Sequence, residues 1–217
     1  RPRAREAPQN NDYPRRYLQL LEDNVVGRAG IRLQNKAKDG DTLDVAANRK
    51  IEDAWAQWGR KGGCDVTGKY SWVDCQNMFI ATVARDGEAL IRKVYDKRSP
   101  FGFLLQFIEV DALDENHNQE TRGGNVVKMG IELDQYERPV AYWLRVNRAS
   151  EDTYFTAGAH RVRIPAEQII HAFRPERPHQ TRGYSWMASA LVHMHHLNVF
   201  EEAAIVAGRI GASSMGF

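Results

Sequence analysis

The stretch HAFRPERPHQTRGYSWMASAL, residues 171–191, joins a region of alternating apolar residues to a long apolar segment. Its two prolines restrict the backbone, so the loop can hold guanidinium groups toward phosphate or carboxylate at a small entropic cost. The same composition also fits an ordinary helix-entry loop whose arginines pair with neighbouring acids. The candidate contact residues toward other subunits or DNA are His171, Arg174, Arg177, His179 and Arg182.

A long helix is predicted after this loop. Ser185 is a favourable N-cap, and apolar residues recur at helical spacing as far as about Ile210. Small residues dominate the second half of this segment and allow close contact between helices, including helices of different subunits. The candidate helix-packing residues are Ala203, Ala204, Ala207, Gly208 and Gly211.

The region before the loop is predicted to be a sheet, because the spacing of apolar residues changes from helical to alternating at Gly87. A hairpin turn is expected over 134–139, and Pro165 opens a short turn that leads into a strand ending at Phe173. The other predicted strands are 88–95, 101–110, 128–134, 138–146 and 160–165.

The N-terminal region is predicted to be mainly helical, with a short strand over 30–34. Helices are expected over 15–27, 43–58 and 71–86. The predicted fold class is therefore α+β, with N-terminal helices, a central antiparallel sheet and a long C-terminal helix.

Residues 1–12 are polar and arginine-rich, which predicts a flexible basic arm that becomes ordered against a partner. The predicted organisation is this arm, an α+β domain over 13–184 and the long helix over 185–217, with ends that resemble those of a fragment. The candidate DNA or partner contacts in and after the arm are Arg1, Arg3, Arg5, Arg15 and Arg16.

The composition is that of a folding chain, with a net charge of only +2 from 30 basic and 28 acidic residues. This balance does not by itself predict nucleic-acid binding. No window approaches the length of an apolar membrane span, and the N-terminus lacks the apolar run of a signal peptide. Cys64 and Cys75 are expected to be reduced thiols in a cytoplasm.

The sequence offers weak candidates for catalysis or metal binding. In the group His193, His195 and His196, at most two side chains share a helical face, so a solvated face is favoured over a metal site. Cys75 lies on an apolar helical face, whereas Cys64 follows glycines in a loop that could expose it. The acids that could do acid–base work or bind Mg²⁺ are Asp111, Asp114, Glu115, Glu132 and Asp134. We predict no catalytic residue, no metal and no cofactor.

Several blocks, in order along nearly the whole chain, resemble the lambda-type family of tailed-phage portal proteins. The most specific block is IPAEQIIHAFRPERPHQTRGYSW, residues 164–186. The others include NVVGRAGIRLQ (24–34), WAQWGRKGGCDVTGKYSW (55–72), RDGEALIRKV (85–94), LLQFIEVDALD (104–114) and MGIELDQYERPVAYWL (129–144).

The resemblance implies a non-enzymatic virion protein that forms a ring, usually a dodecamer, at one capsid vertex. DNA would pass through the ring without sequence recognition during packaging and ejection. The implied partners are the packaging terminase and the capsid and head-completion proteins, in the host cytoplasm during assembly and without a membrane. Family members continue beyond the helix at the end of this chain, which would correspond to the wing region and the start of a stem helix.

Two other functions remain open from the residues alone. A stand-alone nucleic-acid-binding module would use the basic N-terminal arm, with Phe107, Tyr142 and Trp143 stacking on bases. These aromatic residues also fit the interior of the predicted strands. A metal-dependent hydrolase would use the acidic loops.

Overall fold

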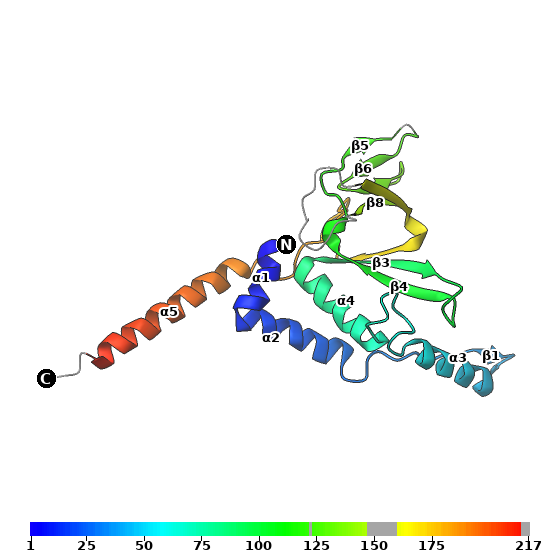
Figure 1. The fold of residues 1–217 in the computed structure, drawn as a ribbon, viewed down its shortest axis with the longest axis horizontal. Coiled ribbons are helices and arrows are strands. Elements are labelled where there is room, and N and C mark those ends of the chain that lie inside the picture. The colour runs from blue at the N-terminus through cyan, green and yellow to red at the C-terminus, as the bar shows by residue number, and fades with distance from the viewer. Residues whose placement is uncertain (122, 147–159, 214–217) are drawn as a thin grey trace.

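The computed structural model describes residues 1–121, 123–146 and 160–213. Helices come first, antiparallel strands follow, and a long helix ends the chain, which confirms the predicted α+β class (Figure 1). The helical elements are α1 (Pro2–Asn10), α2 (Asp12–Leu21), the π-helical turn η1 (Glu22–Val26), α3 (Val45–Trp58), α4 (Trp72–Asp86), the 3-10 turns η2 (Val110–Ala112) and η3 (Ala166–Gln168), and α5 (Leu191–Ser213).

The strands form two main antiparallel sheets and a small hairpin, rather than the one central sheet expected. The three-stranded sheet has the order β10-β3-β4, the five-stranded sheet has the order β5-β6-β7-β8-β9, and β1 pairs with β2. The strands are β1 (Lys38–Asp39), β2 (Thr42–Leu43), β3 (Glu88–Tyr95), β4 (Phe103–Ile108), β5 (Gln119–Glu120), β6 (Val126–Lys128), β7 (Ile131–Leu133), β8 (Pro139–Val146), β9 (His160–Pro165) and β10 (Ile169–Phe173).

Two apolar clusters hold the layers together. Because side chains alternate across a strand, adjacent residues of β3 point to opposite faces of its sheet. Leu90 joins a cluster shared with the five-stranded sheet, which contributes Ile131, Tyr142 and Ile164. Ile91 faces the other way and packs in a second cluster, on the side of the helices.

The second cluster lies between the three-stranded sheet and the helices α3 and α4. Trp58 is 5% exposed, and its indole Nε1 donates to the carbonyl of Phe103 at 2.9 Å. Cys64 and Cys75 are fully buried in this cluster, so the expectation that Cys64 could be exposed is wrong. α4 begins with a capping box between Ser71 and Asp74.

The N-terminal residues differ most from expectation, because α1 is a helix packed against the body rather than a flexible arm. Asn11 then caps α2 by accepting a hydrogen bond from the amide of Tyr13 at 2.8 Å. The strand expected over 30–34 is absent from the described structure. The amide and carbonyl of Ile31 are instead satisfied by the Gln76 side chain, at 2.6 and 3.1 Å.

Two further boundaries differ from the predictions. The strand expected over 128–134 is a hairpin of β6 and β7, because Met129 and Gly130 both take positive φ and reverse the chain. The last helix begins at Leu191 rather than Ser185, and residues 186–190 form turns. The hairpin turn before β8 and the η3–β10 segment are confirmed.

The long helix α5 projects away from the sheets and passes α1 and α2 (Figure 1). It packs on α1 near its start, and most of its length is exposed in this chain. The loop of residues 174–190 therefore connects a layered body to a helix that extends from it.

Candidate assembly interface

A buried carboxylate, Glu88 at the start of β3, organises the connection between the body and α5. Its side chain has no solvent exposure, and an unpaired charge there would be strongly unfavourable. Arg182 donates to it through Nε at 2.7 Å, His171 Nε2 lies 2.8 Å from its second oxygen, and the amide of Gly183 donates at 3.1 Å. Arg1 also forms an ion pair with it. Glu88 thus joins β10, the loop and the N-terminus.

The partners of Glu88 keep it ionised. Burial alone would raise the pKa of this carboxyl group, but the hydrogen bonds from His171 and Arg182 and the positive charges of Arg182 and Arg1 lower its pKa to about 2. Glu88 is therefore ionised at neutral pH, and removing one partner would leave its buried charge less well compensated.

The backbone beside Glu88 is in very close contact with the loop. A Cβ atom added to Gly183 would lie 2.0 Å from the carbonyl oxygen of Gly87, and one added to Gly87 would lie 2.3 Å from the Tyr184 carbonyl carbon. The Trp186 amide then donates to the carbonyl of Ala84 at 2.9 Å. These contacts fix the path of the loop over the C-terminal end of α4.

The predicted contact residues of the loop separate into two groups. Arg182 is 5% exposed and the His171 side chain is 4% exposed, so in this structure both act within the chain and not on its surface. Arg174, Arg177 and His179 are exposed. Arg177 donates to the Tyr184 hydroxyl at 3.2 Å, and the ring of His179 contacts the Glu137 carboxylate.

The N-terminal arginines also fall into two groups, those paired with buried acids and those exposed. Arg5 pairs with the buried carboxylate of Asp86 at 2.9 Å, in addition to the Arg1–Glu88 pair. These two charges are thus used inside the chain, which weakens the reading of a free DNA-binding arm. Arg3, Arg15 and Arg16 are exposed.

The buried acids that organise this region were missed by reasoning from sequence. Asp86 and Glu88 flank Gly87 at the change from helix to strand, after Arg85 and before the apolar residues Ala89, Leu90 and Ile91. Carboxylates are rarely buried unless they are paired. The two acids beside Gly87, at the change from helical to alternating spacing, are the only sequence signal that could have indicated buried ion pairs here. The partners could not be inferred, because Arg182 lies 94 residues from Glu88 in the sequence.

The acids proposed for catalysis or Mg²⁺ binding include two that are buried in structural ion pairs. Asp114 pairs with Arg145 and with Arg161, whose Nε lies at 2.6 Å. Glu132 accepts from Arg163 at 2.7 Å, and these contacts use the oxygens that a metal would need. Within residues 1–121, 123–146 and 160–213, no three His, Cys, Asp or Glu side chains are grouped to hold a metal ion.

The two cysteines show no sign of an activated thiol. Burial, together with the neighbouring Cys64 thiol, raises the pKa of Cys75 to about 12, and burial also raises the pKa of Cys64. A nucleophilic cysteine needs a lowered pKa, which is the opposite shift.

In the described part of the chain, no helix is long and apolar enough to span a bilayer.

The exposed helix α5 carries the candidate packing residues on an open surface. Ala203, Ala204, Ala207, Gly208 and Gly211 are all exposed in the single chain. Large apolar side chains on the same helix are exposed too, including Phe200 at 70% and Ile210 at 60%. Large exposed apolar surfaces of this kind are rarely left uncovered in proteins.

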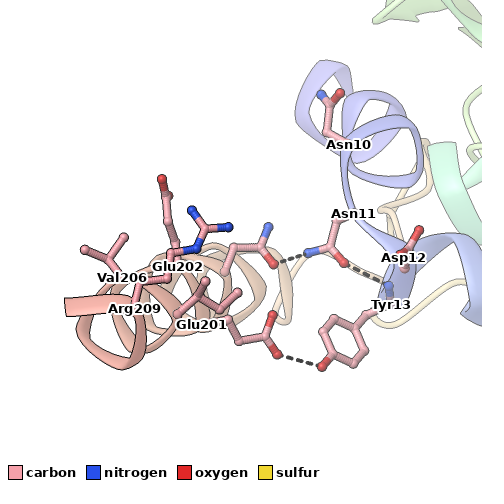
Figure 2. A pocket seen from close by; sticks show the side chains of 10 residues that line it. Asn10, Asn11, Asp12, Tyr13, Glu201, Glu202, Val206 and Arg209 are labelled. Carbon is pink, nitrogen blue, oxygen red and sulfur yellow. Dashed lines mark hydrogen bonds between the residues drawn. The ribbon is translucent and has the colours of Figure 1, made fainter. Parts of the chain in front are cut away.

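A groove of about 720 Å³ lies between α5 and the turn that joins α1 to α2 (Figure 2). Two hydrogen bonds bridge it, from Asn11 Nδ2 to Asn198 Oδ1 and from the Tyr13 hydroxyl to Glu201 Oε1, both at 2.8 Å. These bonds are the dashed lines between the two elements in Figure 2.

The described geometry is a layered body, a fixed connecting loop and an exposed helix that extends from the body. Over residues 1–217 the sequence matches the family described as phage portal protein, lambda family, and the chain belongs to that family.

Individual relatives agree with this assignment. The chain is 39% identical over 218 residues to the probable portal protein of Halomonas phage phiHAP-1, covering 100% of this chain and 42% of that protein. It is 24% identical over 217 residues to portal protein B of Escherichia phage lambda, covering 94% of this chain and 40% of that protein. The chain thus spans less than half the length of these relatives.

Proposed function

We propose that the full-length protein is a structural, non-enzymatic subunit of a portal ring at one vertex of a phage capsid. Copies of the protein would surround the passage for DNA and dock the packaging terminase and the head-completion proteins. The residues of this chain would form the wing and the first part of a stem helix. Family membership supports the structural role, and the exposure of α5 is the observation that carries the assembly argument.

The first apolar side of α5 consists of branched residues. At about 100° per residue, they fall within about 40° of one another around the helix. They are Val192, Val199, Val206 and Ile210, and each is between 46% and 60% exposed.

A second apolar side lies roughly 110° away around the same helix. It consists of Phe200, Ala204, Ala207 and Gly211, all exposed. The chain itself covers a third side, on which Asn198 and Glu201 contact the α1–α2 turn. A helix with two different apolar sides can accept one neighbour on each.

Two unlike surfaces on one helix favour a head-to-tail arrangement, in which the branched side of one copy packs on the small side of the next. Such heterologous contacts produce closed rings when the rotation between copies closes. Small residues let the helix backbones approach closely, which increases van der Waals contact along their length.

The DNA contacts proposed for the ring are the exposed basic residues Arg174, Arg177 and His179 of the loop and Arg3, Arg15 and Arg16 near the N-terminus. With a net charge of +2, the chain suits weak contacts that do not depend on base sequence. Weak contacts permit DNA to move past the subunits.

The assembly argument is tested by Ala207→Leu in the full-length protein. Added bulk on the small side would overpack the contact at a cost of about 1–3 kcal/mol, which weakens association roughly 5- to 150-fold. Native mass spectrometry across a concentration series measures the loss of rings.

Ala212→Leu is the matched control, because it makes the same substitution on the third side of the helix, about 20° from Glu201 and away from both apolar sides. We expect it to assemble like the wild type. If Ala207→Leu formed rings at the same concentrations as the wild type and the control variant, α5 would not pack as proposed.

A further inference from the structure

The α1–α2 elbow, residues 10–13, lies between the body and α5, and its attachment to the body is strong. Arg1 and Arg5 of the first helical segment pair with Glu88 and Asp86, two carboxylates without solvent exposure. Ala4 is 1% exposed in the same contact. Charged hydrogen bonds to buried groups are among the strongest polar contacts in proteins.

The attachment of the elbow to α5 is of a different kind. It consists of the Asn11–Asn198 and Tyr13–Glu201 hydrogen bonds, and Tyr13 is 51% exposed. Open grooves of about 720 and 580 Å³ lie on either side of this contact. Water can replace hydrogen bonds in such a place at little cost, because the net contribution of each bond is small.

A pivot lies at the base of α5. Residues 186–190 form turns and not a continuous helix, while Met187 is 2% exposed and is held in the body. The chain is thus anchored at Trp186 and Met187, and residues 188–190 connect this anchor to α5, which contacts α1 near its start. A change of angle at this point would not disturb either sheet.

We propose that the α1–α2 elbow is a releasable brace that sets the angle of α5. With both hydrogen bonds formed, α5 is held at the angle seen here. When they break, α5 pivots about residues 188–190 and its contact with α1 changes, while the elbow stays fixed to the body. The brace would let the helix adjust to its neighbours without unfolding any part of the body.

The test measures the distance from the body to the end of α5 in the full-length protein, diluted until native mass spectrometry shows single subunits. Spin labels at Lys97→Cys and Ala212→Cys report this distance by pulsed electron paramagnetic resonance. The release variant combines Tyr13→Phe with Asn198→Ala. Loss of two hydrogen bonds should shift the ratio of braced to unbraced helix roughly 10- to 30-fold.

The wild type should give one narrow distance distribution, Tyr13→Phe an intermediate one, and the release variant a broad or displaced one. Arg16→Ala is the control, because Arg16 contacts Gln19 within its own helix, and it should resemble the wild type. A second pair of labels, at Lys97→Cys and Gln19→Cys, should be unaffected by release. Identical α5 distributions in all variants, or an altered α2 distance on release, would overturn the proposal. Both measurements are independent of whether rings form.

Discussion

Glu88 shows how one residue connects distant parts of this chain. It receives Arg182 from 94 positions later in the sequence and His171 from 83 positions later. The sequence predicted that the loop arginines contact phosphate or carboxylate, and the structure shows that Arg182 contacts carboxylate inside the chain. Sequence reasoning could not separate Arg182 from Arg174 and Arg177, because their local composition is the same and only the tertiary contact distinguishes them.

The Glu88 network predicts a large loss of stability for Arg182→Ala. Breaking a buried ion pair by removing one partner costs up to about 3–5 kcal/mol, because Glu88 then loses its most buried cationic partner and keeps only Arg1, His171 and the Gly183 amide. A urea titration followed by tryptophan fluorescence measures the free energy of unfolding. Arg174→Ala, at an exposed position of the same loop, should change this free energy by no more than about 0.5 kcal/mol. Equal effects of the two substitutions would refute the assignment.

The ion pairs of the five-stranded sheet predict a dependence of stability on pH. The hydrogen bond from Arg163 lowers the pKa of Glu132 from 4.5 to about 2, despite the opposing effect of burial. A carboxyl group with a lowered pKa in the folded state stabilises the fold above its unfolded pKa, and this contribution is lost as the pH falls from about 4.5 toward 2.

Glu132→Gln should therefore reduce the free energy of unfolding at pH 7 and converge with the wild type near pH 2. Urea titrations at several pH values measure the difference, with Glu120→Gln at an exposed strand position as the control. A Glu132→Gln effect of the same size at every pH would exclude the charged interaction as its cause.

At the scale of elements, helices and strands with strong periodicity were predictable, and segments held by tertiary contacts were not. β3 and β8 have nearly the predicted bounds because each is rich in apolar residues that pack in a core, and β3 contributes Leu90 to one cluster and Ile91 to the other. The sequence of residues 30–34 resembles that of a strand, but these residues pair with no strand in the described structure. The Gln76 side chain forms hydrogen bonds with the backbone amide and carbonyl of Ile31 instead. Local composition predicts a flexible arm over residues 1–12, because it does not reveal the ion pairs of Arg1 and Arg5 with Glu88 and Asp86.

The crossing of the loop over the junction between α4 and β3 predicts that Gly183→Ala is strongly destabilising. The new Cβ would lie 2.0 Å from the Gly87 carbonyl oxygen, and backbone must move to relieve it. Overpacking of this kind costs about 1–3 kcal/mol, and more where backbone is involved. Thermal melting measures the effect, and Gly123→Ala, which meets nothing within 4 Å, is the control. A melting temperature unchanged by Gly183→Ala would mean that the loop does not cross here.

At the scale of the molecule, the family assignment from the sequence blocks is confirmed by the match over residues 1–217. The division at residues 12 and 184 stays a prediction, and the packed α1 argues for treating the first helices as part of the body. The two-sided apolar surface of α5 was only partly foreseen. The small residues are visible in the sequence. Their exposure is not, because it depends on which part of α5 extends beyond the layered body.

The most direct test of the account is electron cryomicroscopy of the full-length protein. We predict closed rings in which α5 of each copy lies between the corresponding helices of two neighbours, with Val206 on one side and Ala207 toward the other. Single subunits at high protein concentration, or rings in which α5 stands free of its neighbours, would contradict it.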